Sequence, residues 1–252
     1  MIKKIAIVGS GNVATQFALA FQRVNVKITQ IVSRNQKTGK LLAKQTKSLF
    51  TSKLANLIET DLIIICVNDD NIRSVLDQLP EIPMIHTSGS TSINVFKSQI
   101  NGGVMYPLQT LSRSVDADFT TIPICIEANN NVFEDEIFLL SKRISNKVYC
   151  LNSEKRKNLH LSAVIASNFS NFCYLIAKKQ LDAQNIEFEL IKPLILETAK
   201  KIIDTDPKIA QTGPAKRGDK KVIQKHLKIL KDDNYKKIYK LLSENILNEY
   251  EQ

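Results

Sequence analysis

The sequence predicts an α/β fold with a parallel, doubly wound sheet, followed by an all-helical C-terminal domain. Apolar, β-branched runs alternate with segments of helical periodicity over residues 1–151. A turn that contains two glycines joins the first of these runs to the first helical segment. From Ser153 onward no convincing strand follows. We therefore expect two domains, 1–151 and 152–252.

The first domain is expected to supply the sheet and the helices that cover it. The run "LIIICV" is wholly apolar, as a strand covered on both faces must be. Asp69 or Asp70 is expected to cap the N-terminus of the helix at 70–79. Strands are expected at 4–9, 27–33, 61–69, 83–90, 103–111, 122–129 and 147–152, and helices at 12–24, 36–46, 70–79 and 131–145.

The second domain is expected to contain only helices, at 156–184, 187–206, 219–233 and 235–250. Pro193 is expected to cap or kink its helix. The segment Gln211–Asp219 interrupts the pattern with Gly213-Pro214. Two interpretations of this loop stay open: an ion pair between Arg217 and Asp219 fixes it, or Arg217 faces an anionic substrate.

Charge and composition narrow the classes of partner. Lys and Arg number 35 against 25 Asp and Glu, a formal net charge of +10. The basic residues are spread along the chain, Trp is absent and aromatic residues make up 6%, so no nucleic-acid partner is expected. A phosphate-bearing cofactor needs only a few of these charges.

The cysteines and the apolar runs favour a cytoplasmic protein. Four cysteines occur at no short spacing, and Cys66 and Cys125 lie in apolar runs where they pack as small hydrophobes. We therefore expect neither a disulfide framework nor a metal site. No apolar run approaches the ~18 residues of a membrane span, and no signal peptide is evident. The expectation is a reducing, cytoplasmic location with no membrane partner.

The two glycines of the first turn predict a dinucleotide site. Gly9-Ser10-Gly11-Asn12-Val13-Ala14 follows a strand and opens a helix, with a small residue in the third place of the fingerprint. The first glycine permits a tight turn, and the second lets the backbone approach a pyrophosphate. Amides at the helix N-terminus then hold the anion. We expect Gly9, Ser10, Gly11, Asn12 and Val13 at the pyrophosphate; the alternative is a tight turn beside an empty crevice.

The end of the second predicted strand favours NADP(H) over NAD(H). An NAD site places Asp or Glu there, to accept a hydrogen bond from the ribose 2′-hydroxyl. This chain has Ser33, Arg34 and Asn35 instead. A guanidinium can pair with a 2′-phosphate, and the missing carboxylate removes a repulsion. The alternative for Arg34 is an ordinary surface arginine.

Polar residues after two later strands are candidates for the nicotinamide side. Asn68 follows the run "LIIICV", and Ser88 with Gly89 lies in "HTSGS". Ligands bind beyond the carboxyl ends of parallel strands, so these residues are expected to line the cofactor. The alternatives are that Asn68 caps a helix and that "HTSGS" is a polar turn.

Several motifs resemble one group of bacterial proteins. "VGSGNVA", "DLIIICVNDDNI", "HTSGS", "YPLQTLS", "HLSAVIASNFSNFCY", "LIKPLILETAKK" and "TGPAKRGD" occur in that order. The chain resembles Rossmann-like, NADP oxidoreductase-type proteins with a helical C-terminal domain of unknown function. That group is similar to pyrroline-5-carboxylate reductases, deazaflavin-dependent NADP oxidoreductases and β-hydroxyacid dehydrogenases. The resemblance implies an NADP-binding domain and a helical domain for substrate binding and homodimer formation.

The catalytic residues are expected on the first helix of the second domain. The β-hydroxyacid dehydrogenases use a Lys followed one turn later by Asn, but "NLHLSAVIASNFSN" contains no Lys. His160 is the candidate acid, because an imidazole titrates near neutrality. Asn168, eight positions on, is the candidate that orients the substrate. The alternative is that His160 packs at an interface and Asn168 bonds to its helical neighbours.

The expected activity is an NADP(H)-dependent oxidoreductase. It would move a hydride between the cofactor and a small carbonyl or imine substrate. Because the lysine acid is missing, a non-catalytic NADP(H)-binding sensor is the alternative. Neither the substrate nor the direction of the reaction follows from the sequence.

Overall fold

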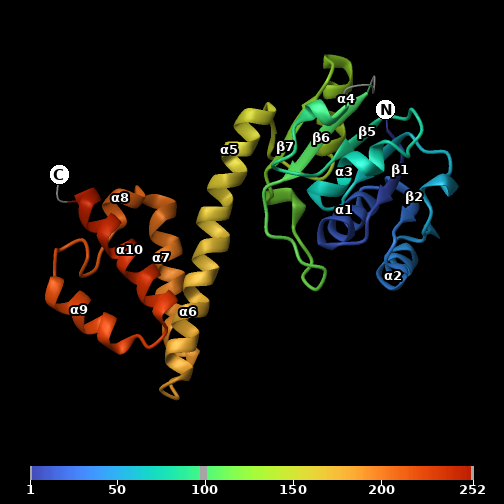
Figure 1. The fold of residues 1–252 in the computed structure, drawn as a ribbon. Helices are drawn as coiled ribbons and strands as arrows, with labels where there is room; N and C mark the ends of the chain where they lie inside the picture. Colours follow the sequence, from blue (N-terminus) through green and yellow to red (C-terminus); the bar gives the residue numbers. More distant parts are fainter. Residues whose placement is uncertain (1, 97–100, 251–252) are drawn as a thin grey trace. The chain divides into compact units, whose positions relative to one another are not determined.

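The structure, a computed structural model, describes residues 2–96 and 101–250. The chain divides into two compact units, Met1–Ser167 and Asn168–Gln252, each of which is described by itself (Figure 1). All the strands of the described residues lie in the first unit, as the sequence predicts, and the second is helical.

The first unit is built on one eight-stranded sheet with the strand order β3-β2-β1-β4-β5-β6-β7-β8. The first six positions of that order, 3-2-1-4-5-6, are those of the doubly wound dinucleotide-binding fold. The strand order reverses between β1 and β4, which opens a crevice at their carboxyl ends. The strands are β1 (Lys4–Val8), β2 (Lys27–Val32), β3 (Leu49–Thr51), β4 (Leu62–Ile65), β5 (Met84–His86), β6 (Gly102–Pro107), β7 (Ile124–Ala128) and β8 (Val148–Cys150).

Both faces of the sheet are covered. In β4, Leu62 and Ile64 belong to one apolar cluster, whereas Ile63 and Ile65 belong to another. Because side chains alternate along a strand, the wholly apolar run reflects burial on two sides. The first cluster includes residues of α1 and α4, and the second includes residues of α3. The helices are α1 (Asn12–Arg23), α2 (Gln36–Thr46), α3 (Asp69–Leu76), α4 (Asn131–Lys142) and α5 (Ser153–Ala163).

The first unit departs from the prediction in three places. Strand β3 was not predicted, because its three residues carry no period of their own. The pair β6–β7 is antiparallel, whereas every other pair is parallel. The connection between them contains only the short 3₁₀ helix η3 (Phe119–Thr121), and a parallel return needs a crossover. Finally, Asn68 and not an aspartate occupies the N-cap position of α3.

A continuous helical segment crosses the boundary of the two units. It consists of α5, the π-helical turn η4 (Val164–Phe169) and α6 (Ser170–Asp182). The π turn begins four residues after His160 and contains Asn168, so the chain between them is not a regular α-helix. By length and composition, the helix Ser153–Asp182 is apolar enough to cross a membrane, and core helices of soluble proteins share these properties.

The second unit contains α6, α7 (Lys192–Asp204), α8 (Pro207–Ala210), α9 (Lys220–Ile229) and α10 (Asp233–Tyr250), with the 3₁₀ helix η5 (Phe188–Ile191). Pro193 lies in the first turn of α7, where a missing amide hydrogen costs nothing. The ion pair between Arg217 and Asp219 is not formed. The Asp219 carboxylate instead caps α9 by accepting from the Val222 amide at 3.1 Å.

The second unit leaves most of its apolar side chains exposed. Among its described residues only Ala215 and Ser243 are buried. Large apolar residues on α6 and α7 are exposed by 42–78%: Phe172, Leu175, Leu194, Leu196, Ile202 and Ile203. A helix that presents this much apolar area needs a covering surface.

Candidate functional site

A pocket of about 920 Å³ opens at the point where the strand order reverses. It is lined by the turns after β1, β2 and β4, by η1 (Leu54–Asn56) and by one side of α3. Of the predicted cofactor residues, six line it: Gly9, Ser10, Gly11, Ser33, Arg34 and Asn68. Asn12 and Val13 form the first turn of α1 directly after Gly11.

The turn after β1 has the two properties that the fingerprint requires. Gly9 has φ +125°, and a Cβ there would lie 2.2 Å from the Cys66 carbonyl oxygen of the neighbouring strand end. Only glycine fits this position. At Gly11 a Cβ would meet no protein atom within 4 Å, so the space above it is open to a ligand. Gly11 is the N-cap of α1 without a side-chain cap, and the first turn holds no acid. These amides favour an anion.

Three hydroxyl groups connect this turn to the start of α2. The Ser10 Oγ atom lies 2.7 Å from both the Ser33 Oγ and the Thr38 Oγ1 atoms. Asn35 caps α2 by accepting from the Thr38 amide at 3.1 Å. The hydrogen bonds hold the end of β2 in a fixed position beside the Gly9–Gly11 turn. Ser33 thus lines the pocket and also makes a hydrogen bond that stabilises the turn.

The charges that line the pocket are all positive. Arg34, Lys53 and Arg113 line it, and no Asp or Glu is among its lining residues. No hydrogen bond or ion pair engages these three cationic groups within residues 2–96 and 101–250. The sequence predicts a cofactor role for Arg34, but it does not single out Lys53 or Arg113. Lys53 follows the unpredicted β3, and Arg113 lies on a loop that is distant in sequence.

Asn68 is an N-cap residue whose side chain makes no capping bond. The carboxamide lies in the pocket wall and is available to a ligand. Asn68 thus occupies the helix N-cap position, and its exposed carboxamide remains able to bind the cofactor.

The segment "HTSGS" is a hydrogen-bonded turn after β5. The Ser88 Oγ atom accepts from the amides of Ser90 and Thr91, at 3.1 and 2.9 Å. The Ser90 hydroxyl donates to the Asp69 carboxylate, which ties this turn to α3. Ser88 and Gly89 are not among the residues that line the pocket, so the structure leaves their cofactor role a prediction.

His160 lies against Gly89. Its Nδ1 atom is 3.0 Å from the Tyr106 hydroxyl, and a Cβ on Gly89 would lie 2.8 Å from the same nitrogen. Burial raises the pKa of Tyr106, so the phenol is protonated at neutral pH. The phenol hydroxyl can donate to Nδ1 of a neutral imidazole or accept from Nδ1–H of an imidazolium, so it holds the direction of the ring in either form. Sequence reasoning named His160 and not Tyr106, although the motif "YPLQTLS" contains it.

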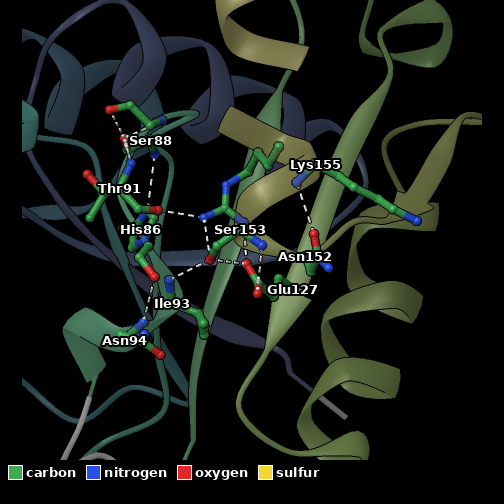
Figure 2. Close-up of polar contacts among 12 residues, drawn as sticks. His86, Ser88, Thr91, Ile93, Asn94, Glu127, Asn152, Ser153 and Lys155 are labelled. Atoms are coloured by element: carbon green, nitrogen blue, oxygen red, sulfur yellow. Dashed lines mark hydrogen bonds and ion pairs between the residues drawn. The ribbon is translucent and has the colours of Figure 1, made fainter. Parts of the chain in front are cut away.

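A buried ion pair fixes α5 one helical turn before His160. Arg156 is fully buried, and its guanidinium donates to the Glu127 carboxylate of β7 and to the Thr91 carbonyl. Ser153 adds two bonds to Glu127, at 2.9 Å from its amide and 2.7 Å from its hydroxyl. Figure 2 shows Glu127, Ser153 and Thr91 converging at this point. The cluster joins β7, the start of α5 and the turn after β5, which places His160 beside Gly89.

His86 is a buried neutral group within the sheet. The Ser88 amide donates to its Nδ1 atom at 3.1 Å, and its ring stacks on Phe96. Burial, assisted by the nearby Arg156 charge, lowers the pKa of His86 to about 3. His86 is therefore a structural residue at neutral pH.

The candidate substrate residue Asn168 belongs to the second unit, where it is exposed in the π turn. Its role stays a prediction. In this part of the molecule Asn171 and Tyr174 border a small, mainly apolar groove of about 410 Å³ that α7 completes.

Comparisons with known proteins identify both parts of the chain. Residues 4–86 match the family described as NADP oxidoreductase, coenzyme F420-dependent. Residues 122–246 match a domain of unknown function, DUF2520. A solved structure from Bacteroides fragilis, assigned as an NADP oxidoreductase, is 36% identical with a TM-score of 0.92, over 98% of both chains. This chain belongs to the family of NADP oxidoreductases that carry this C-terminal domain.

More distant structures share the fold. An imine reductase from Myxococcus stipitatus in complex with NADP⁺ has a TM-score of 0.66 at 13% identity, over 97% of this chain and 92% of that one. A pyrroline-5-carboxylate reductase from Coxiella burnetii has a TM-score of 0.58 at 15% identity, over 100% and 98%. No curated protein matches the chain. The family confirms the predicted oxidoreductase class and NADP as cofactor, and the residues of the pocket fit that cofactor.

Proposed function

We propose that this NADP oxidoreductase transfers a hydride between its cofactor and the carbon of a small carbonyl or imine substrate. The observation that carries the proposal is the pair formed by Tyr106 and His160 against Gly89. Gly89 follows β5, and β5 is the neighbour of β4, whose end lines the cofactor pocket. The pair therefore lies at the carboxyl edge of the sheet, where ligands of this fold bind.

The bound nicotinamide supplies or accepts the hydride. In the reducing direction, the substrate oxygen or nitrogen gains an electron pair as the hydride reaches carbon, and it needs one proton. The proposed donor is His160 in its imidazolium form: Nε2–H gives its proton to the substrate atom, the ring is left neutral, and Nδ1–H stays hydrogen-bonded to the Tyr106 hydroxyl. A positioned acid of this kind contributes roughly 10²–10⁴-fold to a rate. Asn168 is proposed to orient the substrate.

The test is NADPH oxidation with a panel of keto acids and cyclic imines, followed by two variants on whichever substrate turns over. His160→Asn keeps a polar side chain but removes the imidazole, and kcat should fall at least about 100-fold with little change in the Kd for NADPH. Tyr106→Phe keeps the aromatic ring and should lower kcat less while it shifts the pH profile. Unchanged kcat in His160→Asn would remove His160 from the mechanism.

The alternative is a sensor that binds NADP(H) without turnover, which the missing lysine acid favours. Tight NADPH binding by calorimetry, with no oxidation on any substrate of the panel, would support the sensor over the hydride-transfer proposal.

We also propose that the chain forms a homodimer through its helical unit. Among the described residues of that unit only Ala215 and Ser243 are buried, so a second surface must cover its apolar side chains. The exposed apolar residues occur on α7 as well as α6, which a single membrane-spanning helix would not explain. A cytoplasmic location is part of the same proposal, and it is supported by four cysteines that are all unpaired.

A further inference from the structure

The loop that follows β6 is fixed to the first helix by one buried side chain. Gln16 of α1 is 2% exposed. Its Nε2 atom donates to the carbonyls of Ser112 and Val115, at 2.5 and 2.8 Å, and its Oε1 atom accepts from the Ala117 amide at 3.2 Å. All the hydrogen-bonding groups of one carboxamide are thus used to hold a segment about a hundred residues away in the sequence.

The acidic residues of this loop have partners outside the pocket, whereas its arginine lines the pocket. Asp116 pairs with Arg23 at 2.5 Å, and Asp118 caps η3. The Arg113 side chain lines the cofactor pocket, and in the described part of the chain no hydrogen bond or ion pair engages it. The loop therefore directs one unpaired guanidinium at the pocket while its two carboxylates are satisfied elsewhere.

The position of Gln16 indicates which end of the pocket Arg113 serves. Gln16 is four residues after Asn12, the first residue of α1, so it lies ~6 Å along the helix axis from the open amides of the first turn. Its partner Ser112 precedes Arg113 directly. Arg34 and Lys53 instead follow β2 and β3, one and two strands away from β1 at ~4.8 Å per strand. The pocket thus has cations at two separate places.

We propose that Arg113 binds the diphosphate bridge of the dinucleotide opposite the amides of the Gly9–Gly11 turn, and that Gln16 positions it there. This inference rests on NADP binding to the pocket. A dinucleotide has negative charge at its diphosphate bridge, and NADP adds a 2′-phosphate on the adenosine ribose. Arg34, at the end of β2, serves the second group. Arg113 binds the diphosphate bridge, which NADPH and NADH share.

The two roles predict different patterns of cofactor affinity. Isothermal titration of NADPH and NADH should show that Arg113→Gln raises both Kd values by the same factor, about tenfold for a lost charge-assisted bond. Arg34→Gln should raise the Kd for NADPH alone. The matched control is Lys44→Gln, an exposed charge on α2 outside the pocket, which should change neither value.

A double-mutant cycle tests the positioning role of Gln16. Gln16→Met keeps an unbranched side chain of similar length and removes all three bonds to the loop. It should weaken NADPH and NADH equally, as Arg113→Gln does, and should add nothing in the Arg113→Gln background. Thermal melts of each variant separate this effect from a general loss of folding.

Each outcome has a distinct meaning. If wild-type protein binds NADPH and Arg113→Gln binds both cofactors unchanged, the inference is wrong and the proposed function stands. If Arg113→Gln weakens NADPH alone, the residue belongs to the 2′-phosphate, and the assignment to the diphosphate is wrong. If the wild-type protein binds neither cofactor, the proposed function fails first and the inference with it.

Discussion

The imidazole of His160 and the backbone of Gly89 are packed so closely that a single methyl group would not fit between them. A Cβ at position 89 would lie 2.8 Å from both the Cγ and the Nδ1 atoms of His160, and 2.9 Å from the Tyr106 ring. The glycine therefore allows the helix α5 to bring His160 to the carboxyl edge of the sheet.

Substitution of Gly89 by Ala should displace His160. We expect Gly89→Ala to lower the free energy of unfolding by ~1–3 kcal/mol through overpacking, and to lower kcat on any substrate found. Urea unfolding gives the first value. In a His160→Ala background, the stability cost of Gly89→Ala should shrink, because most of the clash is with the imidazole. An equal cost in both backgrounds would show that the strain arises elsewhere.

The two glycines of the first turn should respond differently to the same change. Gly9→Ala places a methyl group against the Cys66 carbonyl in a left-handed backbone conformation, so both stability and NADPH binding should be lost. Gly11→Ala meets no protein atom, so the melting temperature should stay within a few degrees while the Kd for NADPH rises. Scanning calorimetry and titration measure the pair. Normal NADPH binding by Gly11→Ala would contradict the diphosphate assignment of this turn.

Most of the first unit follows from local patterns, since the glycine turn, the apolar run of β4 and the missing acid after β2 are each contained in a few adjacent residues. Arg34 and the Gly9–Gly11 turn could be predicted as cofactor residues for this reason, and the structure brings them to one pocket. Asn68 lines the same pocket, as the rule on strand ends predicts.

What the sequence did not predict depends on contacts between distant segments. Gln16 forms a hydrogen bond with Val115, 99 positions away, and Glu127 forms an ion pair with Arg156, 29 positions away. No periodicity signals such pairs. The π turn that contains Asn168 was not predicted either, because it has no sequence signature of its own.

The end of β2 should set the preference for NADPH. Replacing Arg34 by Glu puts a carboxylate where a 2′-phosphate would bind, and NADPH binding should weaken by roughly 1–3 kcal/mol with NADH nearly unchanged. Lys53→Gln, at the second cation beside this end, should show the same selectivity to a smaller extent. The ratio of the two Kd values is the measurement. A ratio that Arg34→Glu leaves at its wild-type value would contradict NADP selectivity by this residue.

His86 should make the first unit sensitive to acid. Its pKa is about 3 in the folded state and ordinarily 6.5, so the unfolded chain binds this proton first as the pH falls. The stability from a neutral His86 is complete above about pH 6.5 and is lost progressively toward pH 3, about 2 kcal/mol by pH 5. The glutamine of His86→Gln cannot titrate. This variant should have a lower free energy of unfolding than the wild type at pH 7, but its free energy of unfolding should fall less between pH 7 and pH 5. Parallel losses in both proteins, measured by urea unfolding, would assign the acid sensitivity to other groups.

The helical unit should determine the oligomeric state. Leu194 on α7 is 66% exposed, and a charge there would be buried without a partner if a second copy covers this face. We expect wild-type protein to have the mass of a dimer in light scattering after size exclusion, and Leu194→Glu to shift it toward the monomer. Leu139→Glu is the matched control, because Leu139 is 61% exposed on α4 of the first unit and its substitution should leave the mass unchanged. If the wild-type protein is a monomer that floats with phospholipid vesicles, the apolar helices bind a membrane surface instead. If it is a monomer that does not float, the proposed homodimer is wrong.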